Sequence, residues 1–457
     1  MAAPRNIVII GNGITGATAA CHLRKRSDDR ITVISAETKH PFSRPALMYI
    51  FMGDLKYEDT KLYEDGFWAK NRIDLVEGWV EKIDTQARQL HLRGAASMNY
   101  DALVVATGSH AARFGWPGQE LAGVQTMVSY PDMKLLEKNV VRAKRAVVVG
   151  GGLIGIELAE MLLVRGVAVT MLVREKAYWS NVIPEGEAEL IHQHAKEHGV
   201  DLRFGTELKE ILDDGQGRVR GVVTSTGEEI ACEIVGLTIG VRPNLEPAKS
   251  AGVECDKGIL VDEYFRTSAP DVYSGGDCAQ IRQPAPGRRA LEPVWYTGKM
   301  HGEYIAANIC GEQRVYQPGV WFNSAKFFDI EYQTYGDVPS KTPAGIESFF
   351  WLGERKSLRV NFRADSGAVT GVNAFGLRHR HAVWEKWIRE GTSVTEVMAN
   401  LGAANFDPEF FRQFEPEVVA AFNAKYPARK AELRTKRGLF SGYFRRLFGT
   451  APVTANP

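Results

Sequence analysis

The 457-residue sequence contains few cysteines, and they lie far apart. The five are Cys21, Cys232, Cys255, Cys278 and Cys310. Because no two of them form a C-x-x-C pair, a disulfide framework, an iron–sulfur cluster or a zinc site within this chain is not expected. We therefore predict no bound metal ion.

Long hydrophobic runs and an excess of one charge are also missing. No apolar run reaches the roughly 18 residues of a membrane-spanning helix, and the first apolar run begins too close to Met1 for a cleavable signal sequence. The expected compartment is therefore the cytoplasm.

The formal net charge is only +1, so nucleic acid is not an expected partner. A hydrophobic content of 44% and a charged content of 24% are typical of a globular protein, and the length predicts roughly three domains.

Glycine is concentrated in two loops, each of which follows an apolar run and precedes a helix-forming segment. Both loops have the pattern G-x-G-x-x-G, at residues 11–16 and 150–155. The first glycine permits a tight turn, the second lets the backbone approach a pyrophosphate, and the third lets the helix pack closely on its strand. The helix N-terminus then attracts the phosphates. One such loop is weak evidence, but two in the proper context predict two dinucleotides in one chain, and hence electron transfer. The expected binding residues are Gly11, Gly13, Ile14, Thr15 and Gly16 in the first loop, and Gly150, Gly152, Leu153, Ile154 and Gly155 in the second.

A carboxylate is expected at the end of the strand that follows each loop. Glu37 lies 21 residues after Gly16, close to the usual distance of about 20, which predicts hydrogen bonds to a ribose of FAD or NAD. After the second loop, Arg174 stands next to the carboxylate position and would suit a 2′-phosphate. Glu175 would suit a ribose instead. The sequence slightly favours NADPH and leaves NADH open.

Three further motifs follow in a fixed order: Ala106-Thr107-Gly108, the segment from Gly240 to Asn244, and Gly276-Asp277. With the two loops and Glu37, this ordered set resembles the FAD-dependent pyridine nucleotide-disulfide oxidoreductase superfamily, from residue 5 to about residue 310. The resemblance implies FAD at the first loop and NADH or NADPH at the second. It also implies that Asp277 binds the FAD ribityl chain, and that a helix starting near Trp295 directs its positive end at the flavin.

The resemblance predicts an α/β fold of two Rossmann-like dinucleotide-binding domains, the second inserted in the first, followed by a C-terminal α+β domain. The expected boundaries are 1–112 and 246–320 for the FAD domain, 113–245 for the NAD(P)H domain, and 321–425 for the aromatic-rich C-terminal domain. Residues 426–457 form a basic tail.

The branch of the superfamily is indicated by missing cysteines. Disulfide reductases of the superfamily carry a redox cysteine pair after the first acidic residue, and coenzyme A disulfide reductases and related NADH oxidases carry one cysteine there. Here residues 40–49 contain none. The string Arg44-Pro45-Ala46-Leu47 instead resembles that of oxygenase-coupled ferredoxin reductases and their nitrite reductase relatives. In the former, a lysine two residues further on pairs with a glutamate of the second glycine motif. This chain has Glu157 at the glutamate position but Tyr49 at the lysine position.

The candidate catalytic residues are Arg44, Pro45, Tyr49, Glu157 and Trp295. Trp295 and Tyr296 are expected to cover the flavin or to relay electrons toward an acceptor, and the alternative is that they pack in the core. No catalytic triad is expected, because hydride transfer is carried by the cofactors. The predicted function is an NAD(P)H-dependent FAD oxidoreductase that passes electrons to a ferredoxin-like or rubredoxin-like protein. Two alternatives stay open: reduction of oxygen, a quinone or another small acceptor, and a non-enzymatic flavoprotein that senses nucleotides.

The C-terminal tail has its own pattern. Residues 428–450 contain seven lysines and arginines against one acid, with aromatic and leucine residues at helical spacing between 439 and 448. Such a segment is typical of a membrane-surface helix or of a docking peptide for a partner. The alternative is that its apolar stripe packs on its own domain or on a second copy in a homodimer.

Overall fold

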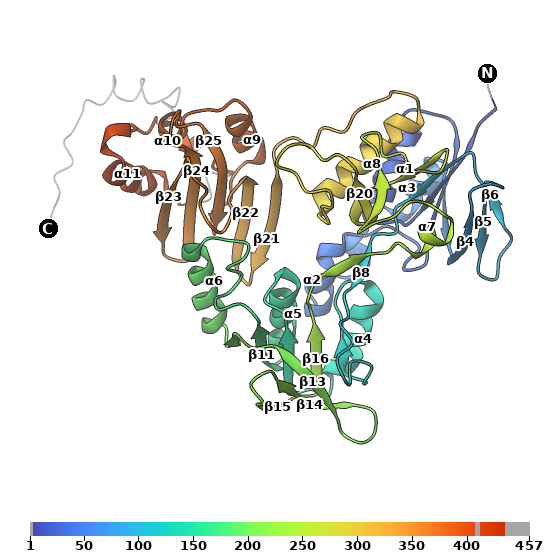
Figure 1. The fold of residues 1–457 in the computed structure, drawn as a ribbon, viewed down its shortest axis with the longest axis horizontal. Coiled ribbons are helices and arrows are strands. Elements are labelled where there is room, and N and C mark those ends of the chain that lie inside the picture. The colour runs from blue at the N-terminus through green and yellow to red at the C-terminus, as the bar shows by residue number, and fades with distance from the viewer. Residues whose placement is uncertain (1–2, 407–411, 435–457) are drawn as a thin grey trace, which may run out of the picture. The chain divides into compact units, whose positions relative to one another are not determined.

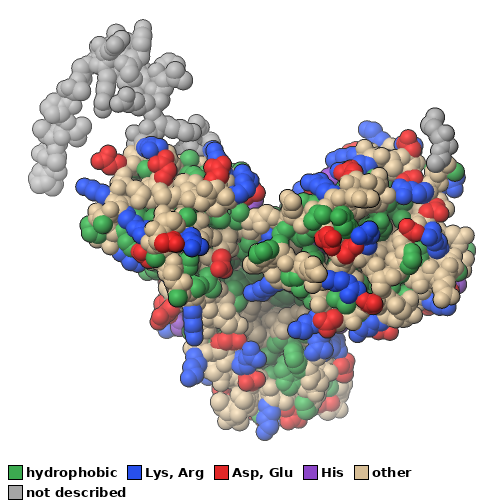
Figure 2. Space-filling model, turned by 45° about the horizontal axis from the view of Figure 1, so that its top comes forward, with side chains coloured by type: hydrophobic (Ala, Val, Ile, Leu, Met, Phe, Trp, Pro, Cys, Tyr) green, Lys and Arg blue, Asp and Glu red, His purple; other side chains and the backbone are tan. Residues whose placement is uncertain are grey.

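The computed structural model describes residues 3–406 and 412–434. The chain divides into two compact units, Met1–Asp329 and Ile330–Pro457 (Figure 1). No helix in the described residues is long and apolar enough to cross a membrane. On the face shown in Figure 2, lysine and arginine side chains are interspersed with aspartate and glutamate, so that face offers no extended area of one charge.

The first unit contains a five-stranded parallel sheet of order β19-β7-β1-β2-β3. The strands are β1 (Asn6–Ile10), β2 (Arg30–Ser35), β3 (Ile73–Glu77), β7 (Ala102–Val105) and β19 (Val272–Ser274). β1 lies between two neighbours and is buried from Ile7 to Ile10, as expected for a strand covered on both faces. Strand β19 reaches this sheet only after the second sheet has been completed. The second dinucleotide domain is therefore inserted in the first, as predicted.

The second parallel sheet has the order β12-β11-β10-β16-β9. Its strands are β9 (Val124–Gln125), β10 (Arg145–Val149), β11 (Ala168–Val173), β12 (Asp201–Phe204) and β16 (Ile234–Leu237). The helices near it are α4 (Tyr130–Val140), α5 (Leu153–Val164) and α6 (Glu185–Glu197), and an antiparallel sheet follows from β13 (Leu208–Asp213), β14 (Val219–Thr224) and β15 (Glu229–Ala231).

Two helices of the first domain, α1 (Ile14–Arg24) and α8 (Trp295–Ile309), pack side by side (Figure 1). A Cβ on Gly302 would lie 2.5 Å from the carbonyl oxygen of Thr15, so only glycine permits this approach. The Thr15 hydroxyl donates a hydrogen bond of 2.9 Å to the carbonyl oxygen of Gly298. This contact brings the start of α8 next to the first glycine loop.

Shorter elements complete the first unit. The helices are α2 (Leu47–Met52), α3 (Asp65–Lys70) and α7 (Glu246–Ser250), with 3₁₀ turns η1 (Arg44–Ala46), η2 (Tyr57–Thr60) and η3 (Gly276–Cys278). The strands are β4 (Val80–Asp84), β5 (Gln89–Leu92), β6 (Met98–Asn99), β8 (Ser109–Ala111), β17 (Val241–Pro243), β18 (Ile259–Val261), β20 (Ala279–Ile281) and β21 (Phe322–Phe327). β8 pairs with β17 antiparallel, and each of them links the two domains.

The second unit contains antiparallel strands in the order β22-β25-β24-β23. They are β22 (Ile330–Gly336), β23 (Ile346–Gly353), β24 (Lys356–Arg363) and β25 (Val369–Phe375); the helices are α9 (His381–Arg389), α10 (Val394–Ala399) and α11 (Glu415–Lys425), with 3₁₀ turns η4 (Leu401–Ala403) and η5 (Pro427–Arg429). Phe349, Phe362 and Phe422 are fully buried. The predicted α+β character of the C-terminal region is confirmed.

Candidate functional site

The first glycine loop has the geometry of a pyrophosphate cradle. Gly11 has φ +104°, and a Cβ on it would lie 2.1 Å from the carbonyl oxygen of Ala106. A Cβ on Gly16 would lie 1.9 Å from the carbonyl oxygen of Gly11. Around Gly13, in contrast, no atom lies within 4 Å of the Cβ position. Gly11 and Gly16 are therefore needed for close backbone packing within the fold. Gly13 instead leaves open space in which a phosphate group can approach the backbone.

The second loop repeats this arrangement. Gly150 has φ +113°, and a Cβ on Gly155 would lie 2.2 Å from the Gly150 carbonyl oxygen. The Cβ position of Gly152 is again open to at least 4 Å. Gly13 and Gly152 are the N-cap residues of α1 and α5, and no side chain caps either helix. Each helix thus presents backbone N–H groups to an anion, so both loops fit a dinucleotide.

Glu37 follows β2 at the predicted place, but it is engaged by another predicted residue. Arg44 donates to both Glu37 carboxylate oxygens, at 2.9 and 2.6 Å. The backbone N–H of Tyr130 donates to the same carboxylate at 2.7 Å. The side chains expected to act separately therefore form one charge-assisted cluster beside the first loop. Pro45 belongs to the same turn, η1, and is exposed.

The later motifs converge at the crossing of the two domains. The Thr107 hydroxyl donates to the carbonyl oxygen of Asn244 at 2.8 Å, and the Asn244 N–H donates to the carbonyl oxygen of Gly108 at 2.9 Å. The Ser109 hydroxyl donates to Asp277 at 2.9 Å. Burial raises the pKa of Asp277, while this hydrogen bond favours its ionised form. Hydrogen bonds thus connect the Ala106-Thr107-Gly108 motif to Asn244, in the motif that begins at Gly240. Asp277 contacts the same region through its hydrogen bond with Ser109.

At the start of α8, Trp295 is partly buried and Tyr296 is 36% exposed. The Tyr296 hydroxyl shares a hydrogen bond of 2.9 Å with Ser324, and its ring lies 4.6 Å from that of Phe322. A flavin-covering role for either aromatic stays a prediction. Further along α8, burial lowers the pKa of His301 to about 3. Its Nδ1 accepts the N–H of Gly276 at 3.1 Å, so this histidine is a neutral structural residue.

Lys326, a residue of β21, was not among the residues that the sequence indicated. Its ammonium group lies 2.7 Å from a carboxylate oxygen of Glu160 and 5.0 Å from the centre of the Tyr49 ring. Burial and the neighbouring Glu160 raise the pKa of Glu157 to about 7, and Lys326 opposes this rise. A lysine from another part of the chain thus lies beside Tyr49 and the acidic residues of α5. No local pattern around residue 326 indicates this placement.

The residues at the second carboxylate position do not separate NADH from NADPH. Arg174 is 70% exposed and lies 3.3 Å from Glu175, and the preference for NADPH stays a prediction. Near the second loop, Tyr178 is fully buried and lies beside the Cβ position of Gly151. Burial and the charge of Glu157 both raise the pKa of Tyr178, so its hydroxyl group stays protonated. Like Lys326, Tyr178 was not indicated by the sequence.

The five cysteines are free thiols. Cys21, Cys232 and Cys278 are buried, and burial raises the pKa of each. A thiol with a raised pKa is a poor nucleophile, so a structural role suits these three cysteines better than a catalytic one.

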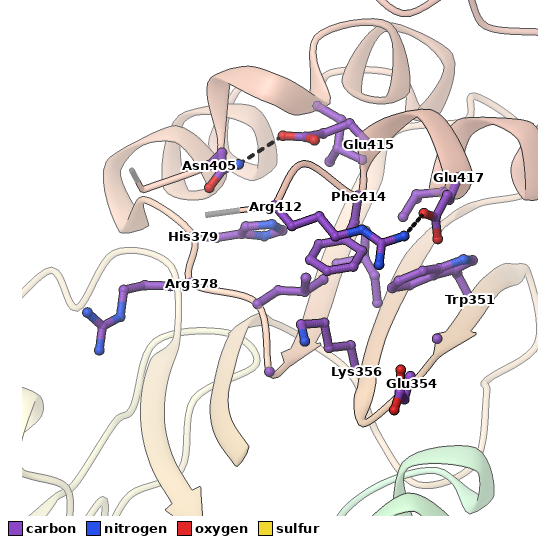
Figure 3. A pocket seen from close by; sticks show the side chains of 16 residues that line it. Trp351, Glu354, Lys356, Arg378, His379, Asn405, Arg412, Phe414, Glu415 and Glu417 are labelled. Carbon is purple, nitrogen blue, oxygen red and sulfur yellow. Dashed lines mark hydrogen bonds and ion pairs between the residues drawn. The ribbon is translucent and has the colours of Figure 1, made fainter. Parts of the chain in front are cut away.

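A separate pocket of about 410 Å³ lies wholly within the second unit (Figure 3). Trp351 and Phe414 line it, and the ion pair of Arg412 with Glu417 crosses it at 2.8 Å. The buried carboxyl group of Glu415 accepts a hydrogen bond from Asn405 at 3.1 Å. None of the predicted dinucleotide-binding residues lines this pocket, so it is distinct from the two cradles.

Comparison with known proteins agrees with this geometry. A model of the family described as pyridine nucleotide-disulphide oxidoreductase matches residues 5–294. A rubredoxin-NAD(+) reductase of Ectopseudomonas oleovorans is 30% identical over 67% of this chain and 80% of its own length. The ferredoxin reductase component of a chlorobenzene dioxygenase from Cupriavidus sp. (strain PS12) is 32% identical over 67% of this chain and 75% of its own length.

A solved ferredoxin reductase of Rhodopseudomonas palustris superposes with a TM-score of 0.74 at 25% identity, over 81% of this chain and 91% of its own. The match to the family model spans both glycine cradles and the later motifs as far as Asp277. The chain therefore belongs to the pyridine nucleotide-disulphide oxidoreductase family, and it is an oxidoreductase that uses FAD and a nicotinamide dinucleotide.

Proposed function

We propose that this enzyme takes reducing equivalents from NADH or NADPH and delivers electrons to a protein carrier of the ferredoxin or rubredoxin class. The observation that carries the proposal is the pair of pyrophosphate cradles in one unit, combined with a segment, residues 40–49, that holds no cysteine. Without a thiolate at that place, electrons have no route to a disulfide substrate through this segment. The relatives named above, a rubredoxin reductase and a ferredoxin reductase component, support a protein acceptor.

The chain's residues position the cofactors and set the local charge. FAD supplies the chemistry, because it accepts a hydride from the reduced nicotinamide and can release electrons one at a time. Gly13 and the start of α1 would hold the FAD pyrophosphate, with the Glu37–Arg44 pair at its ribose end and Asp277 at the ribityl chain. The N-terminus of α8 would favour negative charge on the flavin. Gly152 and the start of α5 would hold the nicotinamide dinucleotide.

We propose that Lys326 and Glu157 act at the nicotinamide end of the site. Lys326 lies over Tyr49, which stands where the related ferredoxin reductases carry their lysine, and it also pairs with α5. We propose that this contact replaces the Lys–Glu pair. Glu157, with a pKa of about 7, changes its charge within the physiological range.

The proposed function is tested by stopped-flow spectroscopy under anaerobic conditions. Mixing the FAD-loaded protein with NADH or NADPH is expected to bleach the flavin rapidly with one of them. Mixing the reduced enzyme with a ferredoxin or a rubredoxin is expected to restore the oxidised spectrum at least about tenfold faster than air does, because the protein excludes acceptors that do not dock. Faster reoxidation by air or by a quinone would establish a small-acceptor reductase instead. An absence of bleaching with both dinucleotides would favour the non-enzymatic alternative.

We also propose that the basic segment 428–450 attaches the enzyme to an anionic membrane surface. Its first residues pack on the second unit: Arg434 pairs with Glu396 at 2.7 Å, and Arg429 donates to the carbonyl oxygen of Ala364 at 2.8 Å. The remaining basic and aromatic residues of the stripe lie in 435–457, outside the described residues. Each lysine or arginine near an anionic surface contributes about 1 kcal/mol, which supports reversible attachment.

Deletion of residues 435–457 is therefore expected to abolish sedimentation with phosphatidylserine vesicles while leaving flavin reduction by the dinucleotide unchanged. Neutral phosphatidylcholine vesicles provide the control. Equal sedimentation of the truncated protein would contradict the proposal, and a change of its elution volume in gel filtration would favour a homodimer contact through the tail.

A further inference from the structure

Two histidines and an aspartate meet away from both cradles. His194 and His198 are four residues apart at the end of α6, and Asp329 follows β21. One ligand atom from each lies within 4.8 Å of the others. Nε2 of His194 lies 2.5 Å and Nε2 of His198 lies 3.8 Å from Oδ1 of Asp329. The i, i+4 spacing places both imidazoles on one face of the helix end.

The three ligand groups are held by their surroundings. Nδ1 of His198 donates to the carbonyl oxygen of His194 at 2.9 Å, which leaves the lone pair of its Nε2 directed at the cluster. A hydrogen bond from the second ring nitrogen to a carbonyl group is the usual way in which a metal-binding histidine is oriented. The His198 ring also stacks on Phe328, with 4.2 Å between the ring centres. His194 is 2% exposed, whereas Asp329 is 63% exposed, so the cluster is anchored on one side and open to solvent on the other.

We propose that His194, His198 and Asp329 bind one Zn²⁺ ion, with water as the fourth ligand. Two imidazole nitrogens and one carboxylate oxygen suit zinc better than magnesium or calcium, which prefer oxygen ligands. Binding requires the proton that His194 shares with Asp329 to leave Nε2, so that the lone pair of this nitrogen can bind the ion. The absence of a metal ion was predicted from the spacing of the cysteines alone. That spacing says nothing about a site made of histidine and carboxylate ligands.

The ion would tie the end of α6 to the segment after β21. That segment continues from Lys326, which contacts Tyr49 and α5. Zinc therefore has a structural role here, since neither cradle contributes a ligand. It would add a fixed point between the dinucleotide domain and the strand that carries Lys326.

The proposal is tested on the untagged, FAD-loaded protein after treatment with a chelator. Isothermal titration with zinc chloride is expected to show one site per chain, and Co²⁺ is expected to give the visible bands of a tetrahedral site in a difference spectrum. Zinc should also raise the thermal midpoint by a few degrees. His198→Asn and Asp329→Asn should lose the binding, the bands and the rise of the midpoint. Because the Asp329 side chain is exposed, its replacement is expected to leave the fold intact, which circular dichroism checks.

His192→Asn provides the matched control. His192 lies on the same helix, but its ring packs against Phe204 and its nearest acid is Glu189, at 3.4 Å. This variant is expected to bind zinc as the parent does. Absence of a stoichiometric site in the parent would overturn the proposal, as would full binding by the Asp329→Asn variant, because the cluster would then be a hydrogen-bonded group only.

Discussion

Replacing Gly13 by valine is expected to yield a folded protein that is purified without its yellow colour. The Cβ position of Gly13 has no atom within 4 Å, and its φ of −62° suits any residue, so the fold has room for the side chain. The isopropyl group would instead occupy the space of the pyrophosphate. Loss of two charge-assisted hydrogen bonds of about 1.5–3 kcal/mol each weakens FAD binding by at least about 100-fold. The measurements are the flavin absorbance per protein and the circular dichroism spectrum.

Two variants make this prediction specific. Gly152→Val is expected to keep FAD but to lose reduction by NADH and NADPH by a comparable factor, because Gly152 is the open glycine of the second cradle. Gly11→Ala is expected to disturb the fold itself, since its Cβ would collide with the Ala106 carbonyl oxygen at 2.1 Å. If Gly13→Val retained FAD, or if Gly152→Val alone lost it, the assignment of the two loops would be wrong.

Replacing Lys326 by methionine is expected to slow flavin reduction by NADH or NADPH at neutral pH but not at high pH. The oxidised nicotinamide carries a positive charge that the reduced form lacks, so an ionised carboxylate nearby favours loss of the hydride. Glu157 has a pKa of about 7, and the rate should fall as the pH drops below it. Removal of the nearby cation raises this pKa further, because Lys326 opposes its rise. At pH 7 the ionised fraction of Glu157 would therefore fall, and the rate of flavin reduction would fall with it, by roughly a few-fold.

The pH profile distinguishes this role from simple packing. At pH 9 the parent and the Lys326→Met variant should differ by less than about twofold, since Glu157 is largely ionised in both. Glu157→Gln should remove the inflection near pH 7 altogether. Lys299→Met, at an exposed position on α8, is the matched control and should follow the parent. A uniform loss of rate at every pH would show that Lys326 acts through packing and not through the charge of Glu157.

Residue spacing alone was sufficient to predict the two dinucleotide-binding units, their glycine loops and the class of cofactor. These features are local: a buried apolar strand, a glycine turn and a helix start lie within about 15 residues of one another, so their spacing carries the information. The absence of cysteine in residues 40–49 is equally local, and it separated this chain from the disulfide reductases. The places of Gly13 and Gly152 in the two motifs therefore predict that these glycines face the phosphates.

Contacts between side chains that are far apart in the sequence depend on the packing of the folded chain. The pairing of Glu37 with Arg44, the position of Lys326 over Tyr49, and the approach of Asp329 to the histidines of α6 leave no periodic signal in the sequence. Lys326 lies in β21, and Asp329 lies in the turn after this strand. Both reach the dinucleotide domains only because the chain returns to these domains after α8. Periodicity records which face of an element is buried, whereas the partner on that face is set by the packing of whole elements, so these contacts could only be seen in the folded chain.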